Sequence, residues 1–380
     1  MKTYVLKRLL LMIPTLLGIT ALTFAIIQLA PGDPAMLRIG SSLQGTIGEQ
    51  QLAQAIIEKT RKEFGLDETL PDKYVFWLRR INRSLGALAS RLPDKYFFWL
   101  RRILGSERIA DWISRMTAQY LIWLKKIATL DFGRSYKDNR PVMERIWERL
   151  PITLQLNIIS IILVYVLAIP IGIFSSTHQY SFSEKVTTVF LFILYSLPSF
   201  WVATLLILFL GGGDYLHWFP ITGISSLNAD QMRWFPWLLD RLWHLVLPVA
   251  CLTYGALAYV SRQMRAGMLE TIRQDYIRTA RAKGLPEKAV IFKHALRNSL
   301  IPIVTLLGFL LPALFGGSVI IESIFTIPGM GQLGFEAILS RDYPVIMAIE
   351  VIAAFLTLLG LLVSDLCYAL VNPTISLEVQ

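Results

Sequence analysis

Residues 276–302 read YIRTARAKGLPEKAVIFKHALRNSLIP, and the pattern of this stretch sets the expectation for the whole fold. An apolar run ends upstream of it near Val260, and another begins near Leu300. Between these runs, residues 261–299 contain nine Lys or Arg residues against three acidic residues. A basic segment between two apolar runs that are long enough to cross a membrane is typical of a cytoplasmic loop in a polytopic membrane protein.

The composition of the chain agrees with a membrane protein. Its 380 residues are 54% hydrophobic and only 17% charged, whereas about a quarter of the residues in a soluble domain are charged. The net charge of +10 could indicate a nucleic-acid-binding protein, but in membrane proteins such an excess more often reflects basic cytoplasmic loops. Both cysteines, Cys251 and Cys367, lie inside apolar runs, so we expect small buried side chains and neither a disulfide nor a metal site.

Six apolar stretches approach the length of about 20 residues that a helix needs to cross a bilayer. We predict membrane-spanning helices at Leu9–Ala30, Ile152–Phe174, Val186–Leu210, Trp243–Val260, Leu300–Ile321 and Val345–Val371. The first follows a basic start, but its apolar core is longer than the about 7–15 residues of a signal peptide, so we expect it to be retained. The fourth is the shortest and contains His244 and Pro248, so we expect a kinked helix that packs against its neighbours.

The distribution of Lys and Arg among the loops predicts the orientation. Segment 261–299 is placed in the cytoplasm, whereas residues 211–242 contain only Arg233 and Arg241 and are rich in tryptophan, as expected of an external loop near the membrane interface. Six spans then place both termini in the cytoplasm. We expect a cytoplasmic N-terminus and first span at 1–30, an external loop at 31–151, a five-helix core at 152–371 and a cytoplasmic tail at 372–380.

The external loop contains an internal duplication. Residues 70–81 read LPDKYVFWLRRI and residues 92–103 read LPDKYFFWLRRI, a repeat with a period of 22 residues that differs only at Val75 and Phe97. A looser copy, QYLIWLKKI, lies at 119–127. Each copy sets aromatic residues beside a basic pair, which is typical of an amphipathic helix at a membrane surface. Two interpretations stay open: a tandem duplication that enlarges a tolerant loop, and a segment with a function of its own.

The basic stretch itself predicts two helices joined by a glycine elbow. Apolar residues recur every four positions from Met264 to Tyr276, which is helical spacing. Basic residues suit the end of a helix, and Gly284 suits the position just after it. A second helix then begins with Pro286 at its first position and Glu287 in its first turn. An ordinary cytoplasmic loop would explain the charges but not this construction.

Motifs lie in order along nearly the whole chain. They are LKRLLLMIPTLLGITALTFAIIQLAPGDPA, LDFGRSY…RPVMERIWERLPITLQL, LYSLPSFWVATLLI, DYIRTARAKGL…IFKHALRNSLIPIVT, ESIFTIPGMGQLGFEAILSRDYPVI and D-x-x-Y at 365–368. Together they resemble the first permease subunit of binding-protein-dependent ABC importers in the dipeptide, oligopeptide and nickel branch, and the basic stretch resembles the EAA-type loop of that family. The chain departs from the family in its duplicated outer segment and at Asn372, where Asp is usual.

The resemblance implies an all-α membrane protein of the type I ABC importer permease fold, with six transmembrane helices and an enlarged external loop between helices 1 and 2. It also implies a bacterial inner-membrane location and the import of di- or oligopeptides. The implied partners are a homologous second permease, two ABC ATPase subunits and an external peptide-binding protein.

The resemblance further implies that loop 261–299 holds a coupling helix, which docks in a cleft of the separate cytoplasmic ATPase. A short helix ended by glycine can protrude as a compact knob, and its Arg side chains can pair with acidic groups of a partner. The residues carried over to this contact are Asp275, Tyr276, Arg278, Thr279, Ala280, Arg281, Ala282, Lys283 and Gly284.

The chain lacks the sequence signature of an ATPase. A phosphate-binding P-loop needs the pattern G-x-x-x-x-G-K-[ST], and no Gly-Lys pair occurs anywhere in the sequence. We therefore expect a non-catalytic subunit that binds no cofactor or metal, with ATP and Mg²⁺ held by partner subunits.

Small and acidic residues near the C-terminal end are candidates for a gate or pathway. Gly316, Gly317 and Ser318, followed by Glu322 and IPGMG at 327–331, predict close helix packing and a broken segment near the outer gate. Glu350 and Asp365 lie in the last span, where an acid costs about 2.5–3.5 kcal/mol on insertion scales. Glu350 fits either the substrate path or the outer interface, and Asp365 lies near the cytoplasmic end.

Three alternative functions remain open from the sequence. An importer of nickel, glutathione or another solute in the same branch is the nearest. A proton-coupled secondary transporter would use the acids of the last span as a relay. A non-transporting membrane scaffold is the third.

Overall fold

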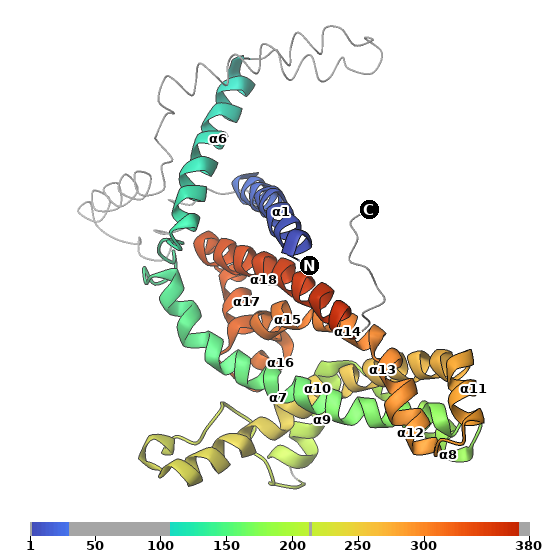
Figure 1. The fold of residues 1–380 in the computed structure, drawn as a ribbon. Helices are drawn as coiled ribbons and strands as arrows, with labels where there is room; N and C mark the ends of the chain where they lie inside the picture. Colours follow the sequence, from blue (N-terminus) through green and yellow to red (C-terminus); the bar gives the residue numbers. More distant parts are fainter. Residues whose placement is uncertain (1, 30–106, 213–214, 372–380) are drawn as a thin grey trace, which may run out of the picture. The chain divides into compact units, whose positions relative to one another are not determined.

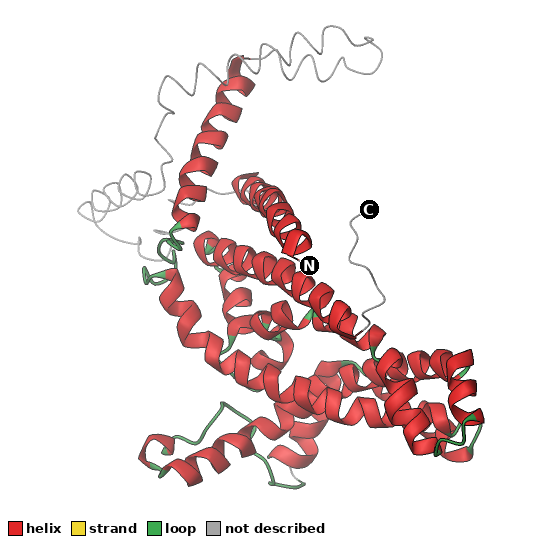
Figure 2. Cartoon of the chain, in the orientation of Figure 1, coloured by secondary structure: helices red, strands yellow, loops and turns green. Residues whose placement is uncertain are grey.

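The computed structural model describes residues 2–29, 107–212 and 215–371. Helices dominate these residues, and the only strand-like pairing among them is an isolated bridge between Arg134 and Pro141 (Figure 2). The described residues form two compact units, a larger one from 2–17, 144–212, 215–339 and 349–371 and a smaller one from 18–29, 107–143 and 340–348. The all-α class predicted from the sequence is confirmed. The duplication at 70–103 and the tail at 372–380 lie outside the described residues.

Four of the described helices are long and apolar enough to cross a membrane (Figure 1). They are α1 (Lys2–Leu29), α7 (Val142–Thr177), α10 (Trp234–Ile272) and α18 (Tyr343–Val371). The first, second and sixth predicted spans therefore lie in single helices, apart from Ala30, which is outside the described residues. A helix suits a membrane span because its apolar side chains can face lipid while most of its backbone groups bond within the helix.

The third predicted span is a bent pair of helices rather than one helix. Its parts are α8 (Phe182–Ser196) and α9 (Ser199–Leu206), the second extended by a π-helical turn η1 (Ile207–Gly211), and they meet at 97°. The bend falls at Leu197, whose backbone is extended, directly before Pro198. A residue before proline is driven out of the helical region, so Leu197 ends α8. With this pair counted as one span, the described residues hold up to five.

The fourth predicted span had the shortest apolar run of the six, but it lies within α10, the longest helix among the described residues. Helix α10 has 39 residues and extends past both ends of the predicted Trp243–Val260, with Pro248 inside it. The predicted span is confirmed, but its bounds are too short, because the apolar run stops where Arg262 appears whereas the helical pattern of buried side chains continues through Met264 and Met268. The helix therefore carries the chain directly from the apolar run into the basic loop.

The fifth predicted span, Leu300–Ile321, is not a continuous helix. It consists of α14 (Ile301–Leu307), α15 (Leu310–Gly316) and α16 (Val319–Ile324), followed by α17 (Met330–Leu339). Gly317 separates α15 from α16 with a φ of 66°, a left-handed conformation that favours glycine. The break at the small residues 316–318 agrees with the interruption expected there.

In the smaller unit, aromatic side chains join the second half of α1 to α6 (Glu107–Ala128). The ring of Phe24 lies 5.6 Å from that of Tyr120 and 5.7 Å from that of Trp123, and Thr20 hydrogen-bonds the Tyr120 hydroxyl at 2.8 Å. Both α6 aromatics belong to QYLIWLKKI, the loose third copy of the repeat. In the same unit, Asp342 accepts hydrogen bonds from the hydroxyl of Ser135 and the backbone of Tyr136.

Two hydrophobic cores can be described in the larger unit from the residues that the structure places. One joins α7, α9, α10 and α16 through nine buried residues: Leu156, Ala203, Leu245, Leu247, Val249, Cys251, Ile321, Phe325 and Ile327. The burial of Cys251 there confirms it as an apolar core residue. The other core lies beside the basic loop and belongs to the candidate site described next.

Candidate coupling site and gate

Helix α11 (Asp275–Ala282) occupies the middle of the basic loop and ends in the predicted glycine elbow. The amide of Leu285 bonds to the carbonyl of Ala280 and the amide of Gly284 to that of Arg281, which is the Schellman pattern of helix termination. Gly284 has a φ of 76°, and no atom lies within 4 Å of the place where a Cβ would stand. The glycine is therefore required by its backbone conformation and not by crowding.

Helix α11 begins at a second break that the sequence analysis did not predict. Helix α10 ends at Ile272, and α11 starts after Gln274, which is its N-cap in an extended conformation. The predicted continuous helix from Met264 to Tyr276 is therefore wrong at its end. Asp275 lies in the first turn of α11, where a negative charge is stabilised by the helix dipole.

The break rotates α11 so that Ile277 and Ala280 face the interior. Ile277 is 0% exposed, whereas Tyr276 is exposed and accepts a hydrogen bond from the side-chain amide of Asn298 at 2.8 Å. The outer face holds Asp275, Arg278 and Thr279. The helix thus has one face anchored to the protein and one face free for a partner.

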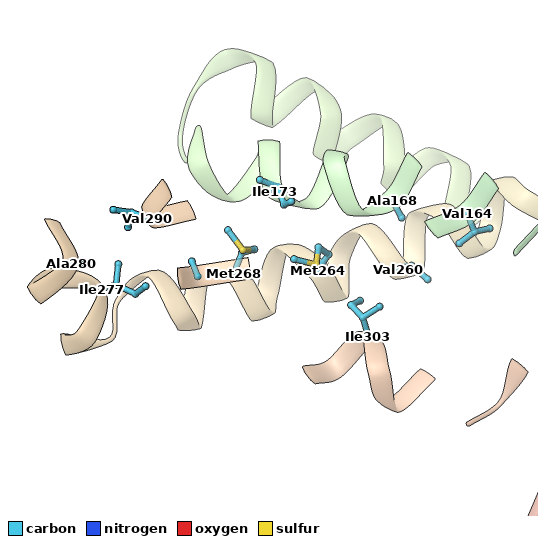
Figure 3. Close-up of a cluster of buried hydrophobic side chains, with 11 residues drawn as sticks. Val164, Ala168, Ile173, Val260, Met264, Met268, Ile277, Ala280, Val290 and Ile303 are labelled. Carbon is cyan, nitrogen blue, oxygen red and sulfur yellow. The ribbon is translucent and has the colours of Figure 1, made fainter. Parts of the chain in front are cut away.

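The anchored face of α11 joins a core that reaches the long helices, which we call the mount. It comprises Val164, Ala168, Ile173, Val260, Met264, Met268, Ile277, Ala280, Val290, Ala295 and Ile303. Figure 3 shows α7 side chains facing Met264 and Met268 of α10, with Ile277 of α11 at the end of the same row. Close packing of this kind transmits displacement, because protein cores have low compressibility.

Two glycines bring the helices of the mount into close contact. A Cβ added at Gly172 of α7 would lie 2.5 Å from the Cβ of Met264, and one at Gly267 of α10 would lie 2.7 Å from the carbonyl oxygen of Ser299. Neither approach is compatible with a side chain. Helices α7, α10 and α13 (Leu296–Ser299) are therefore held together by backbone contact as well as by apolar side chains.

The elbow is closed by an ion pair between Arg281 and Glu287. The guanidinium donates from Nε to Oε2 at 3.1 Å and from a terminal nitrogen to Oε1 at 2.6 Å. This pairing is the main cause that raises the pKa of Arg281 and lowers the pKa of the Glu287 carboxyl. Glu287 opens α12 (Glu287–Ala289), where Pro286 is the N-cap and not the first helical residue as predicted. Arg281 is thus engaged within the chain. Arg278 also pairs, with Asp275 at 3.4 Å, but its side chain is 73% exposed and the pair lies on the outer face of α11, so Arg278 is the more accessible cation.

The candidate gate residues divide into a buried group and an exposed one. Glu322 is 1% exposed and accepts hydrogen bonds from the amides of Ser318 (3.2 Å) and Gln332 (2.8 Å) and from the hydroxyl of Thr153 (3.3 Å). No salt bridge to Glu322 occurs among the residues that the structure describes. Glu350 lies on α18 and is exposed. Glu322 is therefore placed to fasten helices together, whereas Glu350 is open to a partner or a path.

Three small residues that complete the Glu322 site were not singled out in this role from the sequence. Cβ atoms at Gly317 and Gly329 would lie 2.3 and 2.5 Å from the Glu322 carboxyl group, and Thr153 also accepts the amide of Met330 at 2.7 Å. Gly316 lies at the end of α15 in open space. The glycines of GGS and IPGMG could have indicated the Glu322 site from the sequence, since they leave room for a buried carboxylate. Nothing in the sequence around Thr153 on α7 indicates its part in this site.

Asp365 on α18 is paired with residues at the start of α1. A terminal nitrogen of Arg8 lies 3.1 Å from Asp365 Oδ2, and the Tyr4 hydroxyl donates to the same oxygen at 2.9 Å. A carboxylate held between a cation and a hydroxyl is suited to fastening two helices. The described residues contain no group of three or more His, Cys, Asp or Glu that could hold a metal ion.

The chain matches two models of one transport family. The model described as binding-protein-dependent transport system inner membrane component matches residues 168–377, and the model of the N-terminal part of such membrane components matches residues 1–90. An inward-facing structure of the MetNI methionine ABC transporter aligns with a TM-score of 0.44 and 16% identity over 60% of this chain and 97% of that chain, a similarity too distant to add to the family match.

Curated relatives align with the chain from end to end. The oligopeptide transport system permease protein AppB of Bacillus subtilis is 37% identical over 376 residues, which cover 99% of both chains. The peptidoglycan transport system permease protein YejB of Agrobacterium fabrum is 33% identical over 100% of this chain and 99% of the relative. The dipeptide transport system permease protein DppB of Alkalihalophilus pseudofirmus is 33% identical over 99% of both.

Proposed function

The chain belongs to the family of binding-protein-dependent transport system inner membrane components, and on that premise we propose that it carries di- or oligopeptides across a bacterial inner membrane. Membership makes it a membrane-embedded permease of an ABC importer. Peptide cargo is supported by relatives whose names specify oligopeptide or dipeptide transport over nearly their whole length.

The observation that carries the mechanism is the mount beneath α11. An exposed helix of eight residues is anchored by Ile277 and Ala280 in a core that continues into α7, α10 and α14. Force applied to α11 by a moving partner reaches the spans through packed side chains. We infer that Asp275 to Gly284 form the contact with the partner ATPase, and that rigid-body motion of this ATPase switches the permease between inward-open and outward-open states.

The proposed complex contains this chain, a homologous second permease, two ABC ATPase subunits and an external peptide-binding protein. ATP and Mg²⁺ belong to the ATPase subunits, and this chain catalyses no covalent step. We propose that the basic loop and both termini lie in the cytoplasm, which the excess of Lys and Arg between residues 261 and 299 supports. Gly316, Gly317, Ser318 and Glu322 are assigned to the frame of the outer gate, and the exposed Glu350 to the pathway or the second permease.

The proposal is tested by uptake into vesicles that contain the whole complex. The complex and its binding protein are reconstituted with ATP inside, and labelled dipeptide, oligopeptide and nickel are offered in parallel. We expect ATP-dependent accumulation of a peptide and none when the ATPase subunits carry an inactivating P-loop lysine substitution. Accumulation of nickel alone would show that the cargo is nickel and not a peptide. Uptake that persists with the inactive ATPase would favour a proton-coupled transporter, and no accumulation of any solute would favour a scaffold.

A further inference from the structure

A cavity of about 550 Å³ lies among α7, α8 and α10 in the larger unit, apart from the outer face of α11. Its wall includes Ser175 in the last turn of α7, four residues of α8 between 188 and 195, and six residues of α10 between 259 and 266. Phe192 and Tyr195 line the cavity and are also 63% and 51% exposed, so the cavity opens on the outer surface of α8.

Three buried polar atoms of residues that line this cavity have no hydrogen-bond partner among the described residues. They are the hydroxyls of Ser175 and Ser261 and the Nε of Arg265, all buried. Ser175 is only 2% exposed and Ser261 only 1%. An unsatisfied buried donor costs about 1–3 kcal/mol, so a group that accepts hydrogen bonds and reaches these atoms from the cavity would relieve that cost.

The charges around the cavity favour the binding of an anion. Arg265 is neutralised on one side by Glu184, with a terminal nitrogen 2.9 Å from Oε1, while its Nε remains unpaired. Arg262 has no acidic partner among the described residues, and its guanidinium lies over the ring of Tyr195 at 5.8 Å from the centroid. The cavity thus combines one uncompensated positive charge with unpaired donors, which matches a phosphate group.

The surface beside the opening is apolar. Phe190, Phe192 and Ile193 on α8 are each more than half exposed. The opening lies at the end of α10 that leads into the basic loop. Under the orientation proposed above, this is the cytoplasmic half of the membrane, where basic pockets between helices bind anionic lipid headgroups.

We propose that this cavity binds the phosphate of an anionic phospholipid, with Arg262, Arg265, Ser175 and Ser261 around the headgroup and the acyl chains along α8. The assignment uses the proposed membrane orientation but not the proposed cargo. The lipid would fill the space between α8 and α10 and hold α10, which leads into α11, in a fixed relation to α8.

The test measures lipid retention directly, so that it does not depend on transport. The full chain, purified in mild detergent, is mixed with equal amounts of phosphatidylglycerol and phosphatidylcholine, and the retained lipids are counted by native mass spectrometry. We expect preferential retention of phosphatidylglycerol, reduced about fivefold by Arg262→Gln and measurably by Ser261→Ala, since each basic residue near an anionic lipid contributes about 1 kcal/mol.

The matched control is Arg273→Gln, which removes the same charge from the C-cap of the same helix without lining the cavity. It should leave phosphatidylglycerol retention unchanged. Arg265 is not substituted because its loss would strand the buried Glu184. Equal retention of the two lipids, or an equal loss in the Arg273 variant, overturns the proposal. Displacement of the lipid by inorganic phosphate or by a peptide at similar concentration shows a free anion or the cargo instead, and overturns it too.

Discussion

Replacing Ile277 by aspartate is expected to lower ATP-driven uptake at least tenfold, while the chain still inserts into the membrane. Ile277 is fully buried in the mount, where a carboxylate would be desolvated without a partner at a cost of several kcal/mol. A helix of eight residues is too short to be stable on its own, so α11 should leave its position. The measurements are ATP-dependent peptide uptake in vesicles and co-purification of the ATPase subunits.

Two further variants separate this effect from a general loss of structure. Ile277→Val deletes one methylene group, which costs about 0.5–1.5 kcal/mol in a core, and should retain uptake. Gln274→Asp introduces the same negative charge at the exposed N-cap of α11, where aspartate is favoured, and should also retain uptake. Normal uptake by the Ile277→Asp complex would show that the anchoring of α11 does not matter for transport.

Replacing Glu322 by glutamine is expected to destabilise the larger unit by about 1–3 kcal/mol, although the side chains are nearly equal in size. The carboxylate accepts hydrogen bonds from two backbone amides and the Thr153 hydroxyl. The side-chain amide nitrogen of glutamine is itself a donor, so it cannot accept the hydrogen bond of the group that it would face. Each buried group left unpaired costs about 1–3 kcal/mol. The midpoint of thermal unfolding of the purified chain should fall, and uptake should fall with it.

The matched control for Glu322 is Glu350→Gln, which makes the same chemical change at the exposed acid of α18. It should leave the unfolding midpoint of the isolated chain unchanged, whatever it does to uptake by the complex. An unchanged midpoint in the Glu322 variant would contradict the role of this carboxylate as a fastener. A lowered midpoint in the Glu350 variant would show that the two acids do not differ as the structure indicates.

Local features of the basic loop were predictable from the sequence because local chemistry determines them. The conformation at Gly284 needs a positive φ, and the two helices on either side follow from the spacing of their residues. The break after Ile272 was not predictable in the same way, because the four-residue spacing continues through it to Tyr276. Only the packing of Ile277 and Ala280 reveals that the helix restarts in a new rotation.

The long helices also divide into those that the sequence predicted and those that it did not. Hydropathy located α1, α7 and α18, since a span needs a continuous apolar run. It gave bounds too short for α10, where charged residues lie on exposed turns of a helix that continues, and it failed to predict the helix breaks in residues 300–321, where an apolar run is broken by glycine. The buried state of Glu322 could not be predicted either, because it depends on Thr153, which is far away in sequence.

The central claim is that a partner ATPase engages the outer face of α11, and cross-linking tests it most directly. Cys251 and Cys367 are first replaced by alanine, and a single cysteine is then introduced at Arg278 on α11 or, as control, at the exposed Leu227 in segment 211–242. In the assembled complex, a short thiol cross-linker should join position 278 to an ATPase subunit and leave position 227 unlinked to it. A link from position 227, or none from position 278 in a complex that transports normally, would contradict the account.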